Sequence, residues 1–289
     1  MRKLSIFATL LVTFLLFSCS NSENSSSSGQ SQNVVTFTSN SVAKTVTSFQ
    51  ARKSENTIAI TAVTSDGYGL EINFNKFGDL NKVSTYNLMG SESNTSHINF
   101  TSHYFTFNMT SIDESNKIVK GDFTGRLYEN ENDLSSPYVT VSGNFDVVYT
   151  EVTPTVPNLE CYAKIAGQDW YSTKGYQNNG FGMDDFIMQN LSDDDVLIGM
   201  GFNSTNNGPG VYNFTPSSTT NFVHFSKFNT TTLEYDLYNC TGTMTVVSKT
   251  PAIVGYIIDV NYSLTAVNPA NSSQSIQITN GHYKDYYSW

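Results

Sequence analysis

Apolar and polar side chains alternate along many short segments of this 289-residue chain, and that period of two restricts its fold more than any other feature. Residues 103–110 (HYFTFNMT) and 276–279 (IQIT) show the alternation clearly. A period of two places successive side chains on opposite faces of a strand. Asn, Asp, Gly and Ser, which favour turns, separate the segments. The sequence therefore predicts an all-β protein of antiparallel sheets, in which each sheet has one polar face.

An internal repeat divides the chain into two parts. Residues 58–74, which have the pattern of two strands and a turn, recur 127 positions later at 186–188 and 196–202. With an offset of 126, residues 86–88 (YNL) match residues 212–214 (YNF). Offsets that stay nearly constant over such distances indicate a duplicated unit.

The offset between matching residues becomes larger partway along the repeat. It becomes 139, where Phe107 matches Val246, and 138 near the ends, where residues 143–145 (GNF) match 281–283 (GHY). The change predicts a thirteen-residue insertion in the second copy, between Phe214 and Met244. We therefore predict two tandem antiparallel β-sandwich or open-barrel domains, at residues 34–150 and 158–289, joined by a proline-containing linker at 151–157.

The first eighteen residues have the pattern of a secretory signal, with Arg2 and Lys3 before a short apolar segment. That segment is shorter than the roughly 20 residues that a membrane-spanning helix needs. It ends Leu-Phe-Ser-Cys at residues 16–19, which resembles the bacterial lipobox. The resemblance implies a lipoprotein signal peptide at 1–18, cleavage before Cys19, and acylation of Cys19 by chains such as palmitate.

Residues 19–33 are rich in Ser and Asn and predict a flexible tether after the lipidated cysteine. Without Arg2 and Lys3 the chain keeps 13 basic and 25 acidic residues, a net charge of −12. This charge is repelled by anionic lipid, and it argues against nucleic-acid binding, which needs clustered Lys and Arg. We expect a body that stands off the membrane to which its lipid is attached.

Three short motifs in the second copy carry a further resemblance. They are Gly-x-x-Trp at residues 167–170, Gly-x-Tyr at 210–212 and Thr-x-Gly-x-Tyr at 279–283. The chain resembles Bacteroidetes-type cell-envelope lipoproteins with tandem β-rich domains of unknown function, although the first copy lacks the Gly-x-x-Trp element. The resemblance implies a lipid-anchored protein of the cell envelope, with the outer membrane as its expected location and either face open. It implies no activity.

Cys161 and Cys240 lie in the second copy, and the first copy has no cysteine. An exported protein meets an oxidising environment, so a disulfide between them is one interpretation. Two buried free thiols that pack as small apolar side chains are the other.

Asp193, Asp194 and Asp195 form the densest acidic cluster and could hold Ca²⁺ through hard oxygen ligands. They match a hairpin turn of the first copy and lack the spacing of a calcium loop, which favours a solvated turn. The four histidines match no metal-binding spacing. We therefore predict no catalytic residue, no metal and no cofactor.

Aromatic residues make up 13% of the chain, and Trp170 stands next to Tyr171. Exposed Tyr and Trp beside Asn and Ser would suit a glycan or protein ligand, whereas buried rings would be core. The aromatic residues at 286–289 (YYSW) could likewise form an exposed binding surface or belong to a core. These observations predict a non-enzymatic lipoprotein that presents β-domains for binding or as a structural component. The alternative is a carbohydrate-active or other hydrolytic enzyme, with its site in the second domain at the insertion 215–243.

Overall fold

The computed structural model describes residues 31–88, 93–98, 101–179, 185–191, 195–203, 207–252 and 255–287. The signal peptide, Cys19 and residues 20–30 of the tether therefore lie outside the described residues. Ser31–Trp289 forms one compact unit. Within the described ranges, no helix is long and apolar enough to span a bilayer.

The predicted all-β fold is confirmed. Nearly every described element is a strand, the sheets are almost entirely antiparallel, and none of the sheets described closes into a barrel. We call residues 34–151 the N-terminal half and residues 160–287 the C-terminal half, because each half has its own sheets and its own hydrophobic core.

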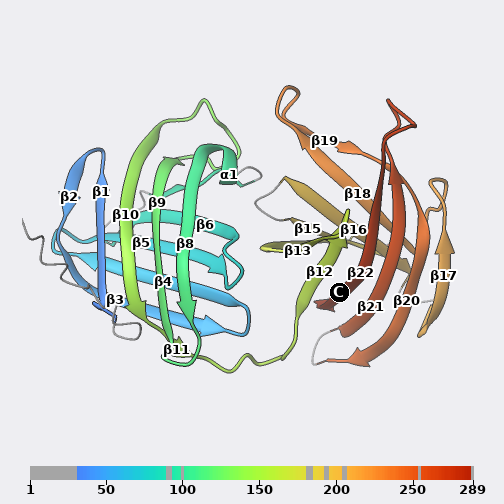
Figure 1. Cartoon of the computed structure of the whole chain (residues 1–289), viewed down its shortest axis with the longest axis horizontal. Helices are drawn as coiled ribbons and strands as arrows, with labels where there is room; N and C mark the ends of the chain where they lie inside the picture. The colour runs from blue at the N-terminus through green and yellow to red at the C-terminus, as the bar shows by residue number, and fades with distance from the viewer. Residues whose placement is uncertain are drawn as a thin grey trace, which may run out of the picture. The chain divides into compact units, whose positions relative to one another are not determined.

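The N-terminal half is built from an eleven-stranded sheet that folds over on itself. The strand order is β11-β3-β4-β5-β6-β7-β9-β10-β1-β2, and β8 pairs with β9. In Figure 1, β1, β10, β9 and β8 form one layer, and β4, β5 and β6 cross behind it. The elements are β1 (Val34–Ser39), β2 (Val42–Lys44), β3 (Val46–Ser54), β4 (Thr57–Thr64), β5 (Tyr68–Asn75), β6 (Leu80–Asn87), β7 (Ser93–Thr95), α1 (Thr101–Tyr104), β8 (Phe105–Asp113), β9 (Ile118–Tyr128), β10 (Tyr138–Val148) and β11 (Thr150–Glu151).

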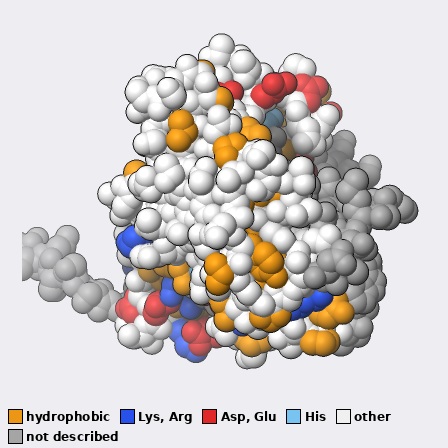
Figure 2. Space-filling view, turned by 90° about the vertical axis from the view of Figure 1, so that its right-hand side faces the viewer, with side chains coloured by type: hydrophobic (Ala, Val, Ile, Leu, Met, Phe, Trp, Pro, Cys, Tyr) orange, Lys and Arg blue, Asp and Glu red, His pale blue; other side chains and the backbone are white. Residues whose placement is uncertain are grey.

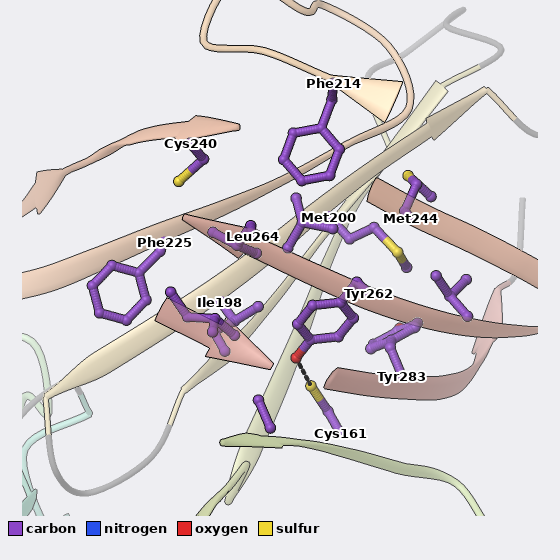
Figure 3. Close-up of a cluster of buried hydrophobic side chains, with 14 of the residues drawn as sticks. Cys161, Ile198, Met200, Phe214, Phe225, Cys240, Met244, Tyr262, Leu264 and Tyr283 are labelled. Carbon is purple, nitrogen blue, oxygen red and sulfur yellow. Dashed lines mark hydrogen bonds between the residues drawn. The ribbon is translucent and has the colours of Figure 1, made fainter. Parts of the chain in front are cut away.

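The C-terminal half has two separate sheets. One has the order β13-β12-β22-β21-β20-β17 and the other the order β14-β15-β16-β18-β19. Their inward faces share one core (Figure 3), as alternation along each strand requires. The elements are β12 (Glu160–Ile165), β13 (Gln168–Tyr171), β14 (Lys174–Asn179), β15 (Asp185–Leu191), β16 (Val196–Asn203), β17 (Gly210–Phe214), β18 (Phe222–Asn229), β19 (Glu234–Leu237), β20 (Asn239–Pro251), β21 (Tyr256–Val267) and β22 (Ser275–Tyr287).

The two halves repeat one strand order. The series β2-β1-β10-β9-β8 corresponds to β13-β12-β22-β21-β20, and β3-β4-β5 corresponds to β14-β15-β16. The matches at residues 58–74 and 143–145 therefore fall on equivalent strands in both copies. The domain boundaries at 150 and 158 stay a prediction, because the described chain from Ser31 onward forms a single compact unit.

One match of the repeat is wrong. Residues 86–88 lie at the end of β6, which pairs with β5, whereas residues 212–214 lie in β17, which pairs with β20 in the other sheet. The place of β6 beside β5 is taken in the second copy by β18 beside β16. In the second copy β17 lies between β16 and β18 along the chain and pairs with β20, so β17 is an extra edge strand and is not the counterpart of β6.

Candidate ligand-binding groove

Strand β12 shows how alternation along the chain builds a surface site. Cys161 and Ala163 are buried in the core of the C-terminal half. The side chains between and beside them, Glu160, Tyr162 and Lys164, therefore lie on the outer face of the six-stranded sheet. The same argument places every second residue of β20, β21 and β22 on this face.

Strand register brings three of these residues into one line across the sheet, which we call the central row. Tyr162 on β12 is in register with His282 on β22, and His282 is in register with Asn261 on β21. Asn280 has a left-handed φ of 51° where the register of β22 shifts by a bulge. A bulge bends its strand and redirects nearby side chains, so this face is not flat.

A second line of residues, the flanking row, runs beside the central row. Glu160 is in register with Lys284, and Lys284 is in register with Asp259. The imidazole of His282 lies between the two carboxylates of this row. Its Nε2 is 3.1 Å from Asp259 Oδ1, and its Nδ1 is 3.5 Å from Glu160 Oε1. The hydrogen bond to Asp259 thus orients the ring of His282, and its other nitrogen faces Glu160.

Aromatic rings lie beside these polar groups. The Tyr162 ring centroid is 5.2 Å from that of His282 and 6.3 Å from that of Tyr171. Burial, with the nearby charge of Glu160, raises the pKa of Tyr162, so its hydroxyl stays protonated at neutral pH. Tyr171 stacks on Phe77, with centroids 3.6 Å apart and an angle of 8° between the planes.

Apart from Lys284 and Asp259, which lie beside it, these residues line an open groove of about 850 Å³. This volume lies within the range of roughly 300–1,000 Å³ that ligand sites occupy. Lys164 and Asp169 form an ion pair across the β12–β13 hairpin at its edge. The lining residues with uncharged hydrogen-bonding side chains are Asn56, Thr243, Thr245, Asn261, Ser263 and Asn280, besides the tyrosines.

The chemistry of the groove is that of polar recognition. It combines flat rings, hydroxyl and amide groups that donate and accept, and two carboxylates that accept. On the face of the molecule that Figure 2 shows, hydrophobic patches lie among uncharged polar side chains and backbone, and most charged side chains lie toward the edges. No group of side chains able to hold a metal ion occurs among the residues that the structure describes.

The two cysteines predicted as a disulfide pair are free thiols. Cys161 lies on β12 and Cys240 on β20, and β22 and β21 run between them. Adjacent strands are about 4.8 Å apart, so three strand spacings by themselves put the two cysteines at least about 14 Å apart. A disulfide needs Cα atoms within about 7 Å. The bridge is therefore not formed, and the second interpretation, two buried thiols, describes the structure.

Both thiols are inert by environment. Cys161 approaches the Tyr262 hydroxyl at 3.9 Å (Figure 3). Cys240 donates to the carbonyl oxygen of Tyr238 at 3.4 Å. Burial raises the pKa of Cys161 to about 12 and that of Cys240 to about 11. Because the thiolate is the reactive form, neither side chain is a nucleophile at neutral pH.

The acidic cluster is only partly described. Asp193 and Asp194 lie outside the described residues, so the calcium interpretation stays a prediction. Asp195 precedes β16, and its Oδ2 pairs with Nε2 of His103.

The adjacent residues Trp170 and Tyr171 lie in different environments. Trp170 is 3% exposed and belongs to the core, whereas Tyr171 lines the groove. Of the terminal aromatics, Tyr286 is partly exposed, and Trp289 lies outside the described residues. The insertion 215–243, where the alternative enzyme site was predicted, contributes only Thr243 to the groove lining.

Sequence reasoning missed Glu160, Tyr162 and Asp259. A signal for them was present, because Glu160, Tyr162 and Lys164 alternate with two core residues on one short strand. An aromatic ring and two charges thus occupy the outward positions of this one strand. The pairing of this strand with β22 could not be inferred from that pattern. Comparison of the chain with protein-family models, curated proteins and solved structures finds no match.

Proposed function

We propose that this protein is a lipid-anchored lipoprotein of the bacterial cell envelope that presents its β-domains for ligand binding and catalyses no reaction. The observation that carries the binding role is the groove, whose rings, hydroxyls and amides lie on one open sheet face. The anchor is Cys19, acylated after removal of residues 1–18, and residues 19–33 are the tether. The expected location is the outer membrane.

Physical chemistry connects the anchor to the binding role. Each buried CH₂ contributes about 0.8 kcal/mol, so a multiply acylated cysteine holds the protein firmly where one chain would not. A net charge of −12 disfavours contact between the body and anionic headgroups. A polar tether then leaves the body free to meet a ligand in the surrounding solution.

Fractionation of cells that express the full-length protein tests the anchor. We expect the wild-type protein in the membrane fraction and the Cys19→Ala variant in the soluble fraction, because the sulfur that carries the acyl chain is lost. Ser20→Ala is the matched control and should leave the protein in the membrane fraction. A soluble wild-type protein whose mature N-terminus is a residue other than Cys19 would contradict the proposal.

A hydrolytic enzyme is the second candidate, and one observation favours it. Glu160 and Asp259 lie on either side of His282 in the groove, so groups able to exchange protons stand together. Activity on glycoside and ester substrates that is lost in both Glu160→Gln and Asp259→Asn would support an enzyme. Absence of turnover where binding is measured would support the binding role.

A further inference from the structure

We propose that the groove on the outer face of the six-stranded sheet binds a neutral oligosaccharide. The proposal rests on the binding role above and names the class of ligand. It follows from three properties of the groove: a ring that is partly open, a set of uncharged hydrogen-bonding groups on the same sheet face, and carboxylates that outnumber the single lysine.

The ring is that of Tyr162. It stands on the outer face of β12 next to His282 and Tyr171, and its side chain is partly exposed. A sugar ring has one face of C–H groups and an edge of hydroxyls, so it packs on a flat aromatic surface and leaves its hydroxyls at the sides. Tyr offers such a surface at low conformational cost, because its side chain has only two rotatable bonds. Tyr171 is already stacked on Phe77, so Tyr162 is the ring we assign to ligand stacking.

The hydrogen-bonding groups lie across the sheet from that ring. Asn261 completes the central row, and Thr245 is in register with Asn261 on the next strand. Ser263 and Asn280 also line the groove. Amide and hydroxyl groups both donate and accept, which matches ligand hydroxyls that do the same. Several such groups on neighbouring strands would fix the orientation of a ligand that carries many hydroxyls.

The charges in the groove favour a neutral ligand. Lys164 is paired with Asp169, and His282 lies between the carboxylates of Glu160 and Asp259. An anionic ligand would be repelled by the carboxylates of Glu160 and Asp169 in the lining, and it would compete with Asp169 for Lys164. Carboxylates accept hydrogen bonds from sugar hydroxyls, and such charge-assisted bonds are stronger than neutral ones.

A peptide ligand fits this surface less well. Peptide recognition depends on pockets for apolar side chains or on an exposed strand edge. The groove lies over the middle strands of its sheet, β12, β22, β21 and β20, where backbone groups already pair. Its lining mixes aromatic rings with amide and hydroxyl groups.

Affinity electrophoresis tests the proposal with the full-length protein in detergent. The probes are soluble neutral polysaccharides set in native gels: a mixed-linkage β-glucan, an arabinoxylan, a galactomannan and a soluble α-glucan. Polygalacturonate is the anionic comparison. We expect at least one neutral polymer to retard the wild-type protein, and its oligosaccharide to bind in calorimetry.

Variants assign the binding to the groove. Tyr162→Ala should weaken binding at least tenfold, and Tyr162→Phe, which keeps the ring, should retain most of it. Asn261→Ala should weaken binding without touching the core, since this side chain is exposed. Tyr138→Ala is the matched control, because Tyr138 is 46% exposed and does not line the groove.

Binding that survives in both Tyr162→Ala and Asn261→Ala would overturn the proposal. So would retardation by polygalacturonate alone, or by none of the polymers. Membrane partitioning of the same preparations is measured separately. If the wild-type protein binds a neutral polymer but does not partition into membranes, the anchor alone is wrong. If it partitions into membranes but binds no neutral polymer, the oligosaccharide proposal alone is wrong.

Discussion

The outer faces of two equivalent sheets, one in each half, share a strand order and differ in their side chains. The position of the central row is occupied in the N-terminal half by Thr36, Asn144 and Asp122, which are in register on β1, β10 and β9. These three residues offer no ring. The groove thus lies on one of two copies of the same framework.

The flanking row differs in the same way. Its position in the N-terminal half is held by Val34, Asp146 and Lys120, and Lys120 forms a 2.9 Å ion pair with Asp146. In the C-terminal half the basic Lys284 takes the position of Asp146, and the acidic Asp259 takes that of Lys120. Glu160 takes the position of Val34. Substitutions on an exposed sheet face change stability little. A duplicated sheet can therefore acquire a binding surface in one copy while both copies keep the fold.

The halves also differ in how their two layers connect. In the N-terminal half the short β7 pairs with both β6 and β9, so one sheet continues from layer to layer. In the C-terminal half the layers are separate sheets, and their side chains alone join them across the core. The stability of the C-terminal half should therefore depend more strongly on its core packing.

The largest expected effect tests whether the two cores are independent. Phe225 in the C-terminal half is fully buried, and Phe123 in the N-terminal half is 2% exposed. Phe225→Ala and Phe123→Ala should each lower the free energy of unfolding by roughly 3–5 kcal/mol, because each leaves a cavity. Both tryptophans, Trp170 and Trp289, lie in the second copy, so their fluorescence in a urea titration follows that part of the chain.

If the two cores are independent, Phe225→Ala should move the unfolding transition detected by tryptophan fluorescence to a lower urea concentration. Phe123→Ala should leave that transition in place. Circular dichroism of the same samples detects both losses. Equal shifts of the tryptophan transition in both variants would mean that the halves unfold as one cooperative unit.

A pair of equivalent glycines gives the next largest effect. A Cβ at Gly143 would collide with the backbone carbonyl oxygen of Thr36, whereas one at Gly281 would collide with the ring of Tyr262. Overpacking costs roughly 1–3 kcal/mol. We expect Gly143→Ala near the upper end and Gly281→Ala near the lower end, because a ring can turn more easily than a paired strand can move. Urea midpoints measure both, and a larger loss at Gly281 would contradict this ranking.

A smaller effect, confined to the C-terminal half, comes from His224 on β18. Burial lowers the pKa of His224 to about 4, whereas an unfolded chain has the ordinary value of about 6.5. Below pH 6.5 the unfolded state binds a proton that the folded state does not, so stability is full above pH 6.5 and falls as the pH approaches 4. The loss at pH 5 is about 2 kcal/mol.

Tryptophan-detected urea unfolding at pH 7 and pH 5 measures this loss. The variant His224→Gln, which does not titrate, should lose about 2 kcal/mol less than the wild type between these pH values. An equal loss in both proteins would assign the acid sensitivity to other groups.

Several features of the molecule could be predicted from the sequence because they depend on local patterns. Alternation predicted the strand at residues 276–279 and most of the one at 103–110, which lie in β22 and β8, although residues 103 and 104 belong to α1. The constant offset predicted that β4 and β5 have counterparts in β15 and β16, and a local hairpin preserves such neighbours.

Other features were decided by tertiary structure alone. The placement of β18 beside β16, the two strands between Cys161 and Cys240, and the meeting of Tyr162 with His282 all depend on which distant strands pair. A period of two fixes which way a side chain points and says nothing about its neighbour in the sheet. That neighbour is chosen by the packing of whole faces against one core, so the groove exists only once β12 has joined β22.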